Sequence, residues 1–189
     1  MPIESLLNQK NSTLTSMSLS RIFLDRDNPE VTLPCDGYEF LIYPMIGNAV
    51  IRNESLGEYV IGGRKAVTQK PRAAIRVFNN SNVQQDLRVE LYGSRSADLL
   101  LVCLDVGQRP EGDEAYIAMF PVTQFEAHSV GKGTHRRQVR VIEDQPEPYH
   151  IYAGETLNIP GGWSSYPPHA NAREADTRFD QWQECFFVV

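Results

Sequence analysis

The seven residues YEFLIYP, Tyr38–Pro44, form a mostly apolar run of aromatic and branched side chains, with one carboxylate at Glu39, that is bounded by Gly37 and closed by a proline. A run of this length and composition is typical of a β-strand. Similar short apolar or alternating runs recur along the chain: Asn48–Arg52, Ala73–Phe78, Leu87–Tyr92, Leu99–Val106, Ala115–Val122, Gln138–Ile142, Leu157–Ile159 and Glu184–Val189.

Turn-forming residues separate these runs, as in Asp36-Gly37, Asn79–Ser81 and Gln108–Gly112. Gly, Pro and Asn at such positions mark tight connections between strands. The only helix that we expect is a short one near the N-terminus, although Glu174–Gln183 could hold a turn. Gly154-Glu155 reads as a turn that leads into the strand at Leu157. Many short strands at regular spacing predict an all-β fold, an antiparallel sandwich or barrel.

Composition limits what the chain can bind and where it works. Its 189 residues are 41% apolar, which is enough for one good core or two small ones, and the net charge is −6. This acidic balance argues against a nucleic-acid or anionic membrane surface. No apolar run reaches the ~20 residues of a membrane helix, and the N-terminus does not resemble a secretory signal. Three scattered cysteines suit buried thiols, so we expect a cytoplasmic protein.

Two glycine-rich segments in the last third of the chain carry a resemblance to a known family. The first has the pattern GxGxxxRxV, from Gly131 to Val139. The second is GGWSSYPPH, Gly161–His169, and it is followed by ECFF from Glu184. This order and spacing resemble the 5-deoxyglucuronate isomerase family of inositol catabolism, a branch of carbohydrate metabolism. A close relative is the 4-deoxy-5-hexosulose-uronate ketol-isomerase of pectin breakdown.

The resemblance implies a bicupin, with two β-barrels in tandem and the metal site in the second. We therefore expect a cupin-like antiparallel β-barrel (jelly roll) plus the opening strands of a second cupin. The expected organisation is an N-terminal segment at 1–19, a first barrel at 20–125, a linker with a connecting strand at 126–149, and a partial second cupin at 150–189. The basic loop at 131–137 lies in that linker. It has neither the Lys-Ser/Thr ending nor the following helix of a phosphate-binding P-loop.

The same resemblance implies a divalent metal, Zn or Mn, and nominates its ligands. His169 matches the first ligand, Glu184 matches the carboxylate, and Asn171 stands where a second His is expected. An amide is a weak ligand for zinc, and the chain ends before a fourth ligand. The alternative for His169 is a hydrogen-bonded loop residue after two prolines. Nearby acids could complete the set, although nothing in their spacing singles one out: Glu174, Asp176 and Asp180.

A sugar-acid isomerase also needs groups that hold its substrate. The resemblance places Tyr166 near the metal, where its hydroxyl would bond substrate; the alternative is an aromatic packed on Trp163 and Pro167. Arg136 and Arg137 are candidates for binding the substrate carboxylate, because the guanidinium fork matches a carboxylate. Their alternative role is a solvated linker face or an ion pair with the acids at 143–144.

Two hypotheses follow from these patterns. One is an isomerase-family protein that acts on 5-deoxyglucuronate or a similar sugar acid, with little turnover because its metal site is incomplete. The other is a non-catalytic cupin-type module that binds a sugar acid. The chain ends on an apolar strand, Phe186–Val189. Either the fold covers this strand, or it pairs with another copy to give a homo-oligomer, or the chain is a fragment of a longer bicupin, which we favour.

Overall fold

The structure, a computed structural model, describes residues 2–12, 14–34, 37–54, 56–64, 73–78, 86–105, 116–121, 128–141, 151 and 154–162. These residues fall in two compact units. The first unit contains the described residues up to 121 together with Ile151, and the second contains 128–141 and 154–162. No helix among the described residues is long and apolar enough to span a membrane.

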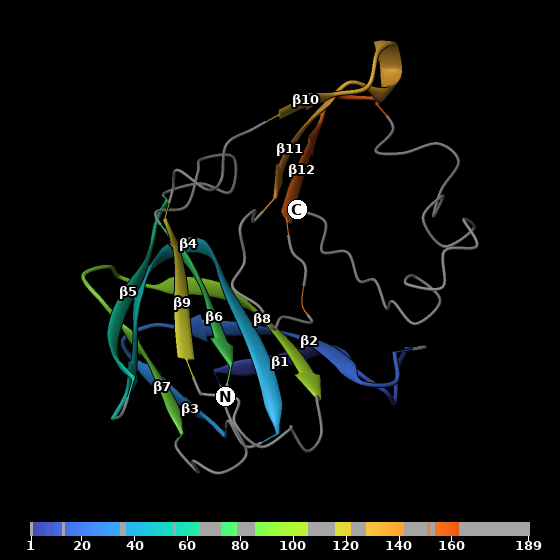
Figure 1. Cartoon of the computed structure of the whole chain (residues 1–189). Coiled ribbons are helices and arrows are strands. Elements are labelled where there is room, and N and C mark those ends of the chain that lie inside the picture. The colour runs from blue at the N-terminus through green and yellow to red at the C-terminus, as the bar shows by residue number, and fades with distance from the viewer. Residues whose placement is uncertain are drawn as a thin grey trace. The chain divides into compact units, whose positions relative to one another are not determined.

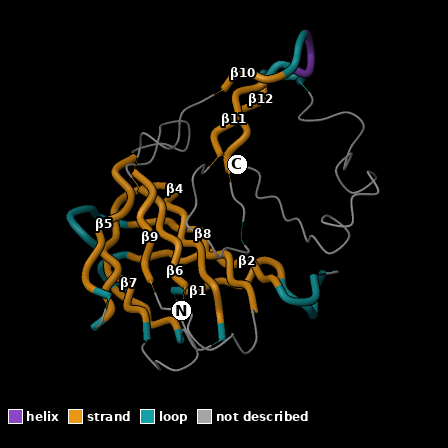
Figure 2. Tube along the Cα trace, viewed as in Figure 1, coloured by secondary structure: helices purple, strands orange, loops and turns teal. Residues whose placement is uncertain are grey.

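The described residues form β-strands with one turn of 3-10 helix, η2, at Gly133–His135, and loops are confined to the connections (Figure 2). The strands are β1 (Ile3–Leu7), β2 (Met17–Leu24), β3 (Glu30–Leu33), β4 (Tyr38–Asn53), β5 (Gly57–Arg64), β6 (Ala73–Phe78), β7 (Leu87–Leu91), β8 (Ala97–Asp105), β9 (Tyr116–Pro121), β10 (His128–Val130), β11 (Arg137–Val141) and β12 (Gly154–Asn158). The predicted all-β antiparallel fold is confirmed.

In the first unit every strand pair is antiparallel, and the sheet curls around one core (Figure 1). Its main order is β1-β2-β8-β4-β6-β9; β4 also pairs with β5 and β7, and β7 pairs with β3. The second unit is a smaller sheet with the order β10-β11-β12. Both units therefore follow the antiparallel pattern that short strands and tight turns predict.

The long strand β4 connects the two halves of the larger sheet. Its first half, up to Ile46, pairs with β8 and β6, and its second half, from Gly47, pairs with β5 and β7. Gly47 has a φ of +79°, and a Cβ at this position would lie 2.1 Å from the carbonyl oxygen of Ser96. Gly62 of β5 has a φ of +104°, and its Cβ would lie 2.1 Å from the carbonyl oxygen of Gly47. Only glycine fits these two positions.

Alternating side chains from opposite sheet halves form one hydrophobic core. Complete burial of each large aliphatic side chain contributes about 1.5–3 kcal/mol. The core residues are Ile22, Leu24, Leu33, Phe40, Ile42, Ala49, Ile51, Ile61, Leu87, Val89, Ala97, Leu99 and Leu101. The other face of the first half of β4 is buried as well, through Leu41, Tyr43 and Met45. Burial on both faces explains why this strand reads as a continuous apolar run.

A carboxylate lies among these apolar side chains on the second face of β4. Glu39 has no exposed surface, and its Oε1 accepts a hydrogen bond of 3.1 Å from the backbone N–H of Ile151. Ile151 is itself buried and belongs to the same unit. Glu39 therefore fixes residue 151 next to β4, 112 positions away in the sequence. A buried carboxyl group needs such a hydrogen bond, because burying a polar group without one is costly.

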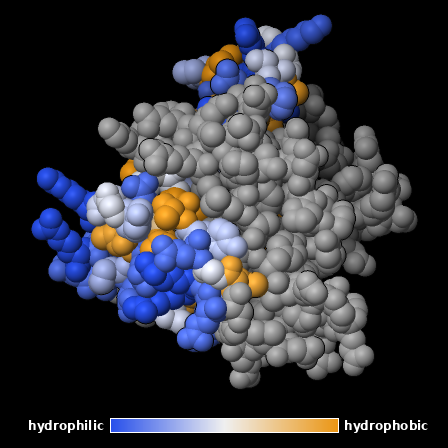
Figure 3. Space-filling view, turned by 60° about the vertical axis from the view of Figure 1, so that its left-hand side comes forward, coloured by the Kyte–Doolittle hydropathy of each residue, from blue (hydrophilic) through white to orange (hydrophobic). Residues whose placement is uncertain are grey.

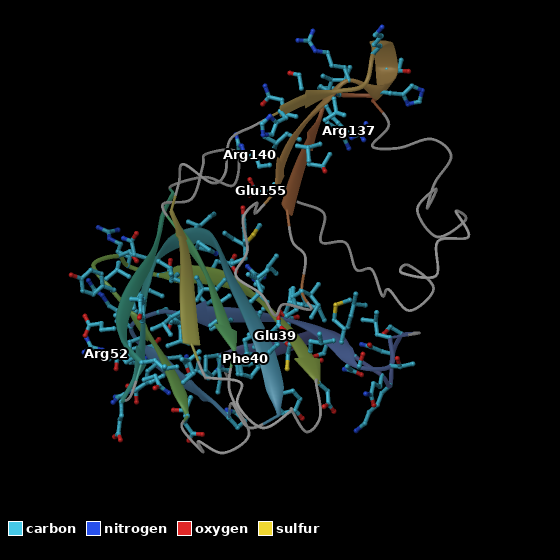
Figure 4. All side chains as sticks on the ribbon, viewed as in Figure 1. Glu39, Phe40, Arg52, Arg137, Arg140 and Glu155 are labelled. Atoms are coloured by element: carbon cyan, nitrogen blue, oxygen red, sulfur yellow. The ribbon has the colours of Figure 1, made fainter. Side chains whose placement is uncertain are left out.

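The outward face of β3, β7, β4 and β5 carries several ion pairs, and Arg52 lies on it (Figure 4). Arg52 contacts Glu58 and Glu90, and Arg88 contacts Glu30 and Glu90. These pairs are exposed and contribute little stability each. In the space-filling view, hydrophilic side chains and small apolar groups are interspersed on the described surface (Figure 3).

Two predictions of secondary structure need correction. The short helix expected near the N-terminus is wrong, because Ile3–Leu7 forms β1 and pairs with β2. Ile3 packs against the core, and this tertiary contact overrides the local preference. The runs at Tyr38–Pro44 and Asn48–Arg52 are one strand, since Gly47 lets the backbone continue from one sheet half into the other.

We expect Gly47→Ala to lower the free energy of unfolding by about 2 kcal/mol or more, because the new Cβ clashes with backbone and the φ is strained. Gly93→Ala is the matched control: its φ is +60°, but nothing lies within 4 Å of the added Cβ. It should cost about 1 kcal/mol, from the backbone alone. Urea unfolding followed by circular dichroism measures both values. Equal losses in the two variants would contradict the role given to Gly47.

Candidate functional site

The structure describes two of the six residues that the sequence nominated for a site. Arg136 and Arg137 lie in the second unit; Arg137 is the first residue of β11, and Arg136 directly precedes it. Tyr166, His169, Asn171 and Glu184 lie outside the described residues. The candidate site is therefore built from the three-stranded sheet and the loop that joins its first two strands.

The basic loop is a tight connection between β10 and β11. The backbone N–H of His135 donates to the carbonyl of Lys132 at 3.1 Å, and that of Arg136 donates to Gly133 at 3.1 Å, which gives the single turn of 3-10 helix. Gly131 has a φ of +76°, and a Cβ there would lie 2.3 Å from the carbonyl oxygen of His135. Glycine at 131 thus lets the chain fold back on itself.

The same loop lies beside the turn that follows β12. The backbone N–H of Gly162 donates to the carbonyl of Ile159 at 2.8 Å and closes this turn. A Cβ at Gly162 would lie 2.9 Å from the carbonyl oxygen of Thr134, so the two backbones touch. The structure thereby brings together the two glycine-rich segments, GxGxxxRxV and the start of GGWSSYPPH, which are far apart in sequence.

The arginines of this sheet differ in environment. Arg136 is exposed, whereas Arg137 is half-buried and donates from Nη1 to the carbonyl of His135 at 3.3 Å. Arg140, three residues further along β11, is 7% exposed. Because side chains alternate along a strand, Arg137 and Arg140 lie on opposite faces of β11 (Figure 4).

Arg140 is paired across the sheet with a carboxylate. It lies directly opposite Glu155 of β12, and its Nη1 donates to Oε2 of Glu155 at 3.1 Å. Both side chains are largely buried, with 8% and 14% of their surface exposed. The Nε of Arg140 is also buried and has no hydrogen-bond partner. Glu155 thus holds this guanidinium in place, and the N–H of Nε remains without a hydrogen-bond partner among the described residues.

Among the described residues no group of three or more His, Cys, Asp or Glu side chains could hold a metal ion. The proposed ligands at 169, 171 and 184 are not part of that set. What the described site offers is cationic. It carries the side chains of Lys132, Arg136, Arg137 and Arg140 against the single carboxylate of Glu155.

Comparison with known proteins places this arrangement in a family. The model of the KduI/IolB family matches residues 4–188. No curated protein matches the chain in sequence. Among solved structures, the chain is similar to an IolB-like protein from Salmonella typhimurium, with 17% identity and a TM-score of 0.66. That match covers 87% of this chain and 58% of the other, so this chain spans little more than half of its length.

Two further structures are similar. A protein from Geobacillus kaustophilus has 11% identity and a TM-score of 0.56, over 77% of this chain and 53% of its own. An RmlC-like cupin family protein from Methanocaldococcus jannaschii has 12% identity and a TM-score of 0.39, over 55% of this chain and 78% of its own. The family match and the likeness to the IolB-like protein confirm the predicted cupin-like fold.

Sequence reasoning missed Arg140 as a candidate. It placed Arg140 on a strand, but it read Gly154-Glu155 as a turn, whereas β12 begins at Gly154. With Glu155 on a strand, an opposite charge across from Arg140 becomes an expected cross-strand pair. The pair depends on the register between β11 and β12, and a short stretch of sequence does not reveal that register.

The first unit also contains a free thiol. Cys103 of β8 is half-buried and packs against the core of the first unit. Burial raises the pKa of its thiol from 9.0 to about 11; the charge of Asp105 adds to the rise, and a hydrogen bond with Ser18 opposes it. The thiolate is the nucleophilic form, so Cys103 is not an activated nucleophile.

We expect iodoacetamide to label Cys103 at pH 8 about a hundredfold more slowly in the folded chain than in the same chain unfolded in urea, because a raised pKa of about 11 lowers the thiolate fraction. The labelling rate of the folded chain should keep rising with pH up to about 11. Mass spectrometry of the peptide that contains Cys103 separates it from the other two cysteines. Equal rates at pH 8 in folded and unfolded chain would contradict the buried, neutral thiol.

Proposed function

Because the chain belongs to the KduI/IolB family, we propose that it is an isomerase-family protein that binds 5-deoxyglucuronate or a similar sugar acid. The observation that carries this proposal is the family match over residues 4–188, almost the full length of 189 residues. The meeting of the two glycine-rich segments on the small sheet supports it, because the sequence resemblance rests on those segments.

The reaction of such a protein is the conversion of a deoxyuronic aldose into its ketose. A proton moves between adjacent carbons through an enediolate, and negative charge develops on oxygen. A divalent metal, Zn or Mn in this proposal, supplies charge stabilisation when bound. We propose His169, Glu184 and Asn171 as its ligands and the hydroxyl of Tyr166 as a hydrogen-bond partner of the substrate.

The anionic substrate calls for cationic side chains. We propose that Arg136 and Arg137 attract and contact its carboxylate, since an arginine fork binds carboxylates better than a lysine does. Arg136 is exposed, so it can meet a ligand from solvent, and Arg137 is half-buried. The proposed process is myo-inositol catabolism in the cytoplasm, in keeping with the likeness to an IolB-like protein and with the free thiol of Cys103. Self-association through the apolar segment 186–189 is part of the proposal.

A second function has one specific observation in its favour. Asn171 occupies the position at which a second histidine ligand is expected, and an amide binds zinc weakly. A chain with that substitution can still bind a sugar acid without converting it. The alternative proposal is therefore a non-catalytic, cupin-type sugar-acid binding module.

We expect the native chain to bind divalent metal weakly and to show little turnover of 5-deoxyglucuronate. Asn171→His should tighten zinc binding by at least about tenfold, because an imidazole replaces an amide in the proposed ligand set. Metal analysis of the purified chain and a coupled isomerase assay measure the two properties.

Asn158→His is the matched control, since it adds a histidine at an exposed position of β12 and should leave zinc binding unchanged. Stoichiometric, tightly held metal together with ready turnover in the native chain would show that other side chains complete the site. Turnover without any effect of Asn171→His on metal affinity would remove residue 171 from the ligand set.

A further inference from the structure

The guanidinium of Arg140 has a buried donor that the chain itself leaves unused. Only 7% of the residue is exposed, and Nε has no hydrogen-bond partner. Nearly all buried polar groups in proteins are hydrogen-bonded, and a donor of a charged group that is left unpaired is costly. The Nε–H of Arg140, unpaired within the described part of the chain, therefore indicates that its partner is a bound ligand.

The geometry of the cation indicates what that partner is. A guanidinium has five N–H donors in a planar fork. Glu155 accepts a hydrogen bond from Nη1. The N–H groups of Nε and Nη2 lie side by side on another edge of the guanidinium. This edge matches the two oxygens of a carboxylate, which arginine binds through two parallel hydrogen bonds. Glu155 also limits the side chain to one orientation, so the edge is preorganised.

The arginines of the small sheet differ in how strongly water screens their charge. Of the three arginines on the loop and strand, only Arg140 is largely buried. A buried cation with reduced solvent screening binds an anion more strongly than an exposed one does.

We propose that Arg140 binds the carboxylate of an acidic sugar through Nε–H and the adjacent Nη2–H, while Glu155 holds the guanidinium through Nη1. The inference rests on the proposed sugar-acid function and assigns the residue that recognises the acid group. Lysine at this position keeps the charge but lacks the fork, so it cannot replace arginine here.

Calorimetric titration of the full chain with D-glucuronate and with D-glucose tests the assignment, because the two sugars differ in the acid group. The native chain should bind glucuronate more tightly than glucose. Arg140→Lys should weaken glucuronate binding by about tenfold or more, the loss expected for a charged hydrogen-bonded pair, and leave glucose binding unchanged. The matched control is Arg95→Lys, at an exposed position of the first unit, and it should change neither affinity.

A second variant separates ligand binding from folding. Arg140→Met with Glu155→Met removes both buried charges at once, which buried pairs tolerate better than the loss of one partner. The double variant should keep its unfolding temperature without ligand and lose the rise that glucuronate produces in the native chain.

Three results would overturn the proposal. They are equal affinity of the native chain for glucuronate and glucose, unchanged glucuronate affinity in Arg140→Lys, and native-like stabilisation of the double variant by glucuronate. In the last two cases glucuronate binds the chain at a place other than Arg140. Isomerase turnover, measured separately, tests the proposed function. If the chain binds glucuronate through Arg140 but shows no turnover, the role of Arg140 stands and the proposed reaction is wrong. If Arg140→Lys leaves turnover unchanged, the proposed reaction stands and the role of Arg140 is wrong.

Discussion

The fold of the first unit depends on one backbone contact, the close approach of Gly47 and Gly62. At this point β4 leaves its pairing with β8 and β6 and begins its pairing with β5 and β7. The carbonyl of Gly47 occupies the space that a side chain at Gly62 would need, and the carbonyl of Ser96 occupies the space beside Gly47. Because a single strand serves both halves of the sheet, the residues on either side of the bend face one shared core. A side chain at the bend would separate those halves.

The strands whose sequences are continuous apolar runs were predicted best. β6 has the expected bounds, Ala73–Phe78, and the start of β7 at Leu87 was also correct. Strands with mixed polarity were missed, as in β2, where serines and Arg21 interrupt the apolar residues. The serines are half-buried inside the sheet, and it is pairing with β8 that makes this segment a strand. Such pairing is non-local, so a window of the sequence does not reveal it.

In the candidate site, too, local features could be predicted from the sequence and contacts between strands could not. The glycine-punctuated loop at 131–137 is visible in the sequence, and the structure shows a tight glycine-dependent connection there. The pair of Arg140 and Glu155 was not identified, because it exists only when β11 and β12 align in one register. A slip of one residue would place Glu155 on the opposite face from Arg140. Residues that depend on local turn geometry are therefore visible in the sequence, whereas cross-strand partners are not.

The two glycine-rich segments matter for a physical reason. Gly131 and Gly162 each allow a backbone approach that a Cβ would block, and both approaches involve the turn at 133–135. The loop, the end of β12 and the start of β11 are thereby held close together by backbone contacts. These backbone contacts place Arg140 on β11 directly opposite Glu155 of β12, where the two side chains pair.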